Sequence, residues 1–277
     1  MPSTTDLVTR PEGGPDLLVR RWVASGEPWA SVLIVHGLAE HSGRYERTGT
    51  ALAAVGLSVE ALDLRGAGGS AGRRADVVRW EDYLDDVEWR LASVRAAAGT
   101  RPVALFGHSL GGLIALDYAT SGRPAPDLLV LSAPALGSTI QGWKRGLVRL
   151  LAGIAPTMKV ANGLSGAQLS RGPAVGEAYF ADPLVETSST LRLGAVGFSA
   201  QARVAAGLST LGIPTLVIHG GADTIVPPAS TEPLAAIPGV RRIVYPDLRH
   251  ETLNEPDGPA VVADIVAWLR ERVLAPA

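Results

Sequence analysis

Residues 103–112 read VALFGHSLGG, and this stretch decides the fold that we expect. The apolar run 103–106 is typical of a buried strand, and the apolar residues after Ser109 predict a helix. A strand, a sharp turn and a helix form the setting of a nucleophile elbow, in which the turn lifts a serine hydroxyl above the sheet edge. Gly107 and Gly111 suit such a turn, because it brings the residues two before and two after the serine close together. The alternative is a glycine-rich turn with an incidental serine.

Strand and helix patterns alternate through the rest of the chain. We expect further strands at 17–23, 31–35, 58–62, 128–131, 214–218 and 242–245, and helices at 44–55, 80–98 and 261–273. Short apolar strands that alternate with helices predict an α/β protein, with a mostly parallel sheet covered by helices on both faces.

The connection between residues 132 and 212 is too long for one crossover helix. We therefore expect an inserted helical cap at 136–204, within a core formed by 1–135 and 205–277. A helix near 140–154 carries apolar residues at near-helical spacing with basic residues between them: Trp143, Leu147, Leu150, Leu151 and Ile154. This stripe either forms a lid that contacts anionic membrane surfaces or packs onto its own domain, and the pattern leaves both interpretations open.

Composition excludes several kinds of site. The 277 residues contain no cysteine, which rules out disulfides, thiolate zinc sites, Fe–S clusters and a cysteine nucleophile. The net charge of −2 argues against a nucleic-acid footprint. No apolar run reaches about 18 residues, and the first fifteen residues lack the apolar core of a signal peptide. We expect a cytoplasmic protein without a cofactor, a metal or a membrane-spanning helix.

A serine nucleophile needs a base, and His250 is the histidine that we choose. It follows the last expected strand, in a loop that reaches the edge of the sheet where the elbow lies. His36 and His219 each end a strand before a glycine and are expected to order turns. His108 lies inside the elbow and is directed elsewhere, and His41 lies in a loop before a helix. A plain surface-loop histidine is the alternative for His250.

Asp223 is the acid that we expect to orient His250. It follows the strand at 214–218 and lies on a loop at the same edge of the sheet. The alternatives are Asp247 and Asp182, or a turn-forming role for Asp223 itself. Asp247 is only three residues from His250, so a capping or turn role suits it better.

An oxyanion hole requires two convergent donors. We expect one to be the backbone N–H of Leu110, directly after the serine. The other is the N–H of Leu38, in the loop that follows the strand at 31–35.

The chain resembles the α/β-hydrolase family, and within it the monoacylglycerol lipases and related lysophospholipase-like serine hydrolases. Four stretches carry the resemblance: HGLAEHSGRY at 36–45, DLRGAGGS at 63–70, GHSLGG at 107–112 and HETLNE at 250–255. The similarity extends over most of the chain. The order Ser109, Asp223, His250 is also the order of an α/β-hydrolase triad. Ala67 departs from the family pattern, because it stands where a histidine is usual.

The resemblance implies hydrolysis of a lipid ester, a monoacylglycerol, through an acyl-enzyme. The second hypothesis is another hydrolase on the same scaffold: a short-chain carboxylesterase, a lysophospholipase or a thioesterase. The third hypothesis is a ligand-binding protein of this fold without catalytic activity. The resemblance does not decide between the two interpretations of the stripe at 140–154. The lid interpretation implies transient contact of the cap with membranes, which would place the protein peripherally on their surface.

Overall fold

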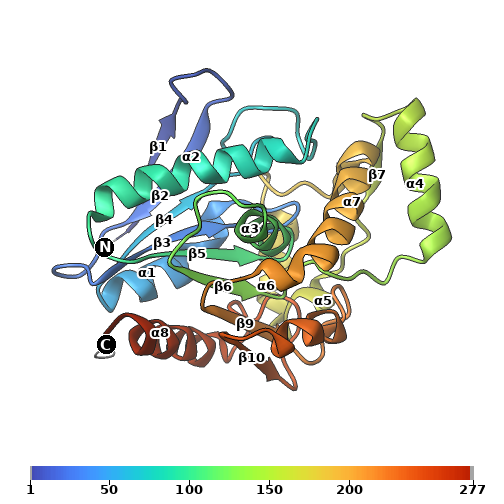
Figure 1. The fold of residues 1–277 in the computed structure, drawn as a ribbon. Coiled ribbons are helices and arrows are strands. Elements are labelled where there is room, and N and C mark those ends of the chain that lie inside the picture. Colours follow the sequence, from blue (N-terminus) through green and yellow to red (C-terminus); the bar gives the residue numbers. More distant parts are fainter. Residues whose placement is uncertain (1, 275–277) are drawn as a thin grey trace.

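The computed structural model describes residues 2–274 and contains an eight-stranded sheet between two layers of helices (Figure 1). The strand order is β1-β2-β4-β3-β5-β6-β9-β10. The first two pairings, β1 with β2 and β2 with β4, are antiparallel, and all the others are parallel. The strands are β1 (Thr4–Val8), β2 (Leu17–Trp22), β3 (Ala30–Val35), β4 (Leu57–Leu62), β5 (Val103–His108), β6 (Leu128–Ser132), β9 (Thr215–Gly220) and β10 (Val240–Tyr245).

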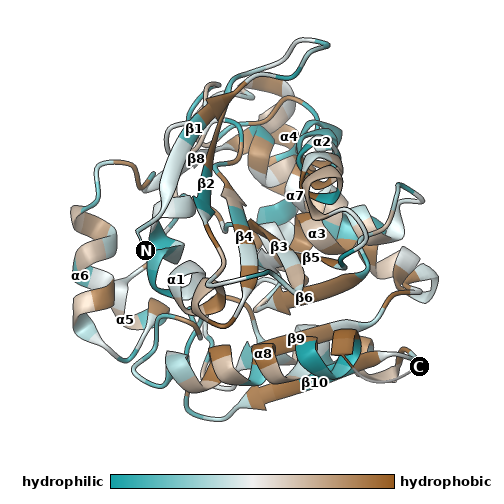
Figure 2. Ribbon diagram, turned by 90° about the vertical axis from the view of Figure 1, so that its left-hand side faces the viewer, coloured by the Kyte–Doolittle hydropathy of each residue, from teal (hydrophilic) through white to brown (hydrophobic). Residues whose placement is uncertain are grey.

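Helices cover both faces of this sheet and form two separate apolar cores (Figures 1 and 2). One layer consists of α2 (Glu81–Ala98), α3 (Leu110–Thr120) and α7 (Leu191–Gly207). The other layer consists of α1 (Glu46–Ala54) and α8 (Gly258–Leu274). Every residue of β3, β5, β6 and β9 is buried, as expected for parallel strands that helices cover on both sides. The expected α/β architecture is therefore confirmed.

The expected helix at 44–55 is two elements, the 3₁₀ turn η1 (Ser42–Tyr45) and the helix α1. The side chain of His41 caps the turn by accepting the N–H of Gly43 at 3.2 Å. The apolar pattern could not reveal this division, because it continues across both elements. Two further 3₁₀ elements are η2 (Leu208–Thr210) and η3 (Pro228–Ala236).

Between β6 and β9 the chain forms a group of elements outside the main sheet, which we propose to be the cap. They are α4 (Gly142–Ile154), β7 (Lys159–Ala161), α5 (Gly166–Leu169), α6 (Pro173–Ala181) and β8 (Ser188–Thr190), and they lead into α7, which packs on the core. The expected boundary at 204/205 falls inside α7, whose buried side chains join the core beside α3. Among residues 2–274, no helix is both long enough and apolar enough to span a membrane.

Helix α4 lies on the outside of this group, next to α7 (Figure 1). The side chains of Trp143, Leu147, Leu150 and Ile154 are 66%, 44%, 64% and 75% exposed. The interpretation in which the whole stripe packs onto its own domain is therefore wrong for these four. The face of α4 that does pack includes Val148, which lies close to Gly194 of α7.

Candidate active site

Ser109 lies at a sharp turn between β5 and α3. Its backbone has φ +52° and ψ −115°, a conformation that non-glycine residues rarely adopt. A Cβ on Gly107 would lie 2.3 Å from the carbonyl oxygen of Gly111, and a Cβ on Gly111 would lie 2.1 Å from that of Val35. Glycine is thus required at both positions, as the sequence pattern predicted.

The structure brings Ser109, His250 and Asp223 together in one hydrogen-bonded chain, although they come from three loops. The Ser109 Oγ lies 2.9 Å from His250 Nε2, and His250 Nδ1 lies 2.7 Å from Asp223 Oδ2. Because a carboxylate only accepts, Nδ1 carries the proton and Nε2 is free to accept from the serine hydroxyl. All three side chains are buried. This arrangement allows His250 to take the proton of Ser109.

The carboxylate of Asp223 is held from several sides. Its Oδ1 accepts the backbone N–H groups of Ile225 and Val226 at 2.8 and 2.9 Å, and its Oδ2 also contacts His219 Nε2 at 3.2 Å. Burial raises the pKa of Asp223, but the hydrogen bonds from His219, His250 and the Val226 N–H outweigh burial and bring the pKa below its ordinary value of 3.8. Asp223 therefore stays ionised at neutral pH.

The other histidines hold the surrounding loops. His36 donates from Nδ1 to the carbonyl oxygen of Gly37 and accepts the Leu64 N–H at Nε2, which agrees with its expected turn role. His219 orders the turn that carries Asp223. Burial and then the neighbouring His250 lower the pKa of His108 to about 4, so its ring is uncharged at neutral pH.

The alternative acids lie elsewhere. Asp182 pairs with His41, at 2.8 Å between Oδ2 and Nε2. Asp247 is exposed in the turn after β10.

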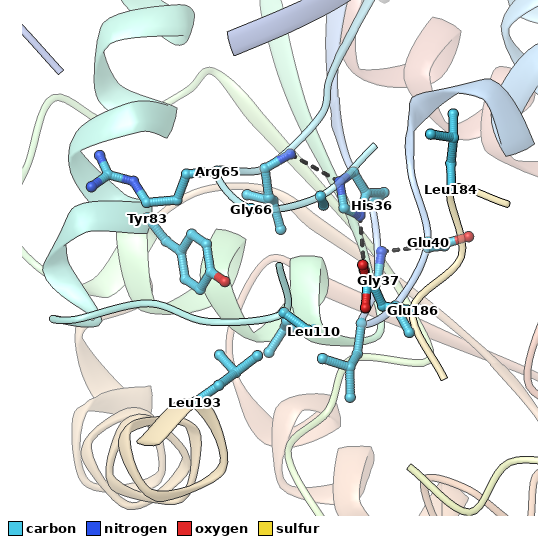
Figure 3. A pocket seen from close by; sticks show the side chains of 15 residues that line it. His36, Gly37, Glu40, Arg65, Gly66, Tyr83, Leu110, Leu184, Glu186 and Leu193 are labelled. Carbon is cyan, nitrogen blue, oxygen red and sulfur yellow. Dashed lines mark hydrogen bonds between the residues drawn. The ribbon is translucent and has the colours of Figure 1, made fainter. Parts of the chain in front are cut away.

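Both residues expected to supply the oxyanion donors are near the serine. Leu110 is the first residue of α3, so its N–H has no acceptor within the helix. No hydrogen bond from the N–H of Leu38 is found within residues 2–274. A Cβ on the adjacent Gly37 would lie 3.2 Å from the Cβ of Ser109, so this loop lies against the nucleophile. Leu38 and Leu110 line one small cavity, of about 20 Å³ (Figure 3).

Ala67 lines the same cavity, where the related family carries a histidine. The loop around it is held instead by Asp63. The Asp63 carboxylate accepts the backbone N–H groups of Ser42 and Gly69, both at 2.7 Å. The Ser70 hydroxyl donates to the Asp63 carbonyl oxygen at 2.6 Å. The loop therefore has polar support that does not depend on residue 67.

A buried ionic cluster, Glu40–Arg44–Glu251, joins the oxyanion loop to the His250 loop. The Arg44 guanidinium bonds Glu40 Oε2 at 3.1 Å and both carboxylate oxygens of Glu251 at 2.7 and 2.5 Å. Glu40 Oε1 also accepts the Gly37 N–H at 2.6 Å. Sequence reasoning gave these residues no role. In the sequence, only their position inside the two most specific motif segments, 36–45 and 250–255, pointed to a role for these residues.

The two carboxylates of this cluster have opposite pKa shifts. Burial raises the pKa of Glu40, but His108, Arg44 and the Gly37 N–H outweigh it, so the pKa falls below its ordinary 4.5. Burial, together with the nearby Glu40, raises the pKa of Glu251 in spite of Arg44.

We expect Glu40→Gln to flatten the acid side of the stability curve. A carboxyl group whose pKa is lower in the folded than in the unfolded protein stabilises the fold above the unfolded value, and this stabilisation is lost as the pH falls below about 4.5. Urea unfolding of wild type and variant from about pH 7 to about pH 3 measures the difference. The free energies of unfolding should converge as the pH falls. Parallel curves would show that Glu40 does not titrate in this way.

The sheet order and helix layers define an α/β-hydrolase fold, and the chain is a serine hydrolase by family. The family model described as serine aminopeptidase, S33, matches residues 26–257, and the chain belongs to this family.

Named relatives of the chain include lipases. A monoacylglycerol lipase of Mycolicibacterium smegmatis is 33% identical over 267 residues, which cover 93% of this chain and 94% of the relative. The phospholipase YtpA of Bacillus subtilis is 30% identical over 249 residues, covering 85% and 93%. The crystal structure of Paleococcus ferrophilus monoacylglycerol lipase superposes with a TM-score of 0.84 at 30% identity, covering 92% and 99%. The chain thus groups with lipases and esterases of the family.

Proposed function

We propose that this protein hydrolyses monoacylglycerols to a fatty acid and glycerol, with Ser109, His250 and Asp223 as the catalytic triad. The observation that carries the proposal is the hydrogen-bonded chain from the Ser109 Oγ through His250 to Asp223, beside the N–H groups of Leu38 and Leu110.

The geometry supports a two-step acyl transfer. His250 Nε2 takes the Ser109 proton while the Oγ attacks the ester carbonyl carbon, and Asp223 stabilises the resulting imidazolium. The Leu38 and Leu110 N–H groups bind the tetrahedral oxyanion. When the intermediate collapses, the C–O bond to glycerol breaks and His250 returns the proton to the leaving oxygen. Water then attacks the acyl-enzyme with His250 as base and releases the fatty acid.

The substrate class rests on similarity together with the apolar surroundings of the site. The relatives described above include two monoacylglycerol lipases. The cavity beside Leu38 and Leu110 is lined in addition by Leu184 and Leu193, next to the charged Glu40, Arg65 and Glu186 (Figure 3). These leucines would contact the start of an acyl chain once the proposed cap has moved. The phospholipase relative supports lysophospholipids as the second candidate substrate.

A substrate series tests this proposal. It compares kcat/KM for monoacylglycerols from acetyl to oleoyl, the matching lysophosphatidylcholines, p-nitrophenyl acetate and an amino-acid arylamide. We expect the highest values on medium- or long-chain monoacylglycerols. A maximum on the acetate esters, without activity on long-chain monoacylglycerols, would reject the lipase assignment. A maximum on the lysophospholipids would establish the second candidate instead.

The site is closed in this arrangement. Ser109 and His250 are 8% and 4% exposed, and a cavity of about 20 Å³ has room for about one water molecule. An acyl chain therefore requires the proposed cap to move away from the core. The exposed apolar stripe of α4, with Lys144 and Arg149 beside it, suits insertion into an anionic membrane surface.

We expect Leu150→Glu/Ile154→Glu to weaken binding to lipid vesicles by about tenfold or more. Each of these side chains would otherwise bury apolar area worth about 1.5–3 kcal/mol. Co-sedimentation with vesicles of phosphatidylcholine and phosphatidylglycerol measures the binding. Leu7→Glu is the matched control, because Leu7 is 63% exposed on β1, outside the proposed cap. Equal binding by wild type and the double variant would rule out docking through α4.

A further inference from the structure

A second cavity, of about 290 Å³, lies at the end of the sheet opposite to Ser109. Ser31 and Ser58, which line it, are the second residues of the parallel strands β3 and β4, whereas Ser109 follows the last residue of β5. Residues at the end of β2 and in the second half of α2 form its other walls. The cavity is an order of magnitude larger than the one beside Leu110 and shares no lining residue with it.

The cavity carries excess positive charge. Three arginines, Arg21, Arg90 and Arg101, line it together with a single acid, Glu60. Glu60 is already bonded on both oxygens, because Arg21 Nε donates to Oε2 at 2.8 Å and Arg90 donates to Oε1. Asp6 pairs with Arg21 outside the cavity. Within residues 2–274, Arg101 makes no salt bridge, whereas the single acid Glu60 is shared by Arg21 and Arg90.

Two of these guanidinium groups keep unused donors. Arg90 is only 4% exposed, and its Nε and Nη2 donate to Glu60 at 3.0 and 2.8 Å, but its Nη1 has no partner within the described residues. The Arg101 Nη2 donates to the Ala97 carbonyl oxygen at 3.2 Å, whereas its buried Nε has no protein partner there. An unpaired buried donor such as the Arg101 Nε costs free energy, which an acceptor bonded to it would recover.

Hydroxyl groups add to this donor set. Ser31, Ser58 and Ser93 line the cavity, and for their Oγ atoms no hydrogen bond is found within residues 2–274. Forked guanidinium donors with nearby hydroxyls match the geometry of an oxygen anion. Beside them, Val94 of α2 adds an apolar side chain, whereas the side chains of Trp22 and Val59 pack into the core on the other face of the sheet.

We propose that this cavity is a binding site for a small oxygen anion, a carboxylate or a phosphate group, separate from the ester-hydrolysing site. Its volume lies at the lower end of the range of about 300–1,000 Å³ found for ligand pockets. The unpaired Arg90 and Arg101 nitrogens bind the anionic oxygens, and the serine hydroxyls donate to those that remain.

Thermal unfolding with defined anions tests the proposal. The midpoint is compared in sodium phosphate, sodium hexanoate and sodium chloride at equal pH and ionic strength. Saturation of the site by phosphate or hexanoate should raise the midpoint by about 2–4 °C relative to chloride. A rise with phosphate alone identifies a phosphate site, and a rise with hexanoate alone identifies a carboxylate site. No rise with either anion overturns the proposal.

Two variants and a control locate the effect. Arg101→Gln should abolish the shift while hydrolysis of p-nitrophenyl acetate stays unchanged. Ser58→Leu keeps every arginine and fills part of the cavity, so it should also abolish the shift. If Arg101→Gln does not fold, the Ser58→Leu result alone tests whether the anion binds in this cavity. Arg73→Gln removes the same charge from an exposed position outside the cavity and should keep the full shift. A shift that persists in both cavity variants places anion binding elsewhere and overturns the proposal.

Discussion

Ser109→Ala should lower kcat for ester hydrolysis by about 10⁴- to 10⁶-fold, because the three triad side chains act as one unit. The variant loses the Oγ that lies 2.9 Å from His250 and no other side chain of the triad. The backbone conformation at residue 109 stays equally demanding for alanine, so the fold should be unchanged. Steady-state assays on the best substrate of the series, with protein folded by circular dichroism, measure the loss.

A fluorophosphonate probe adds an independent measurement. Wild type should be labelled once, on Ser109, and the variant should not be labelled. His250→Gln is a matched second variant, which keeps the hydroxyl but removes its base, and its labelling rate should fall in parallel with kcat. Folded wild-type protein that resists the probe would contradict the enzyme assignment itself. Residual labelling of Ser109→Ala would point to another nucleophile.

Arg44→Leu should lower the free energy of unfolding by about 3–5 kcal/mol. Arg44 is the shared cation of Glu40 and Glu251, and all three side chains are buried. Its removal leaves two carboxylates close together without a counter-charge. Activity should fall as well, because Glu40 accepts the Gly37 N–H beside the oxyanion loop and Glu251 directly follows His250. Urea unfolding and kcat measure the two effects.

The control for this loss is an exposed pair. Arg241 and Glu271 form a salt bridge with side chains 45% and 47% exposed, so Arg241→Leu should change stability by at most about 1 kcal/mol. Adding Glu40→Gln and Glu251→Gln to Arg44→Leu should recover much of the stability, since the unpaired charges disappear. A small loss for Arg44→Leu alone, similar to that of Arg241→Leu, would contradict the stabilising role of the cluster.

The proposed catalytic residues could be predicted because local sequence patterns and strand order identify their positions. The ten residues 103–112 combine a strand, two obligatory glycines and the start of a helix, and the positions of Asp223 and His250 follow from strand order. β1 was missed, because its five residues are largely exposed and show no apolar alternation. The sequence pattern also could not predict that the apolar face of α4 is exposed. An apolar stripe indicates that one face of a helix is more stable out of contact with water. It does not indicate whether protein or membrane covers that face.

The ionic cluster illustrates a second limit. Glu40 and Arg44 are four residues apart, and local reasoning can pair them, but Glu251 lies 207 residues beyond Arg44. Only the fold brings these segments together. The cavity on the far side of the sheet has the same origin, since its arginines come from β2, α2 and the turn after α2.

The backbone at Ser109 has a consequence for protein engineering. A left-handed conformation of this kind costs a non-glycine residue roughly 1–3 kcal/mol, and the wild-type chain retains that cost at its nucleophile. Glycine at position 109 would relieve the strain and abolish the chemistry in one step. A library screened only for heat resistance or expression would therefore enrich inactive clones at this codon, and selection has to include turnover.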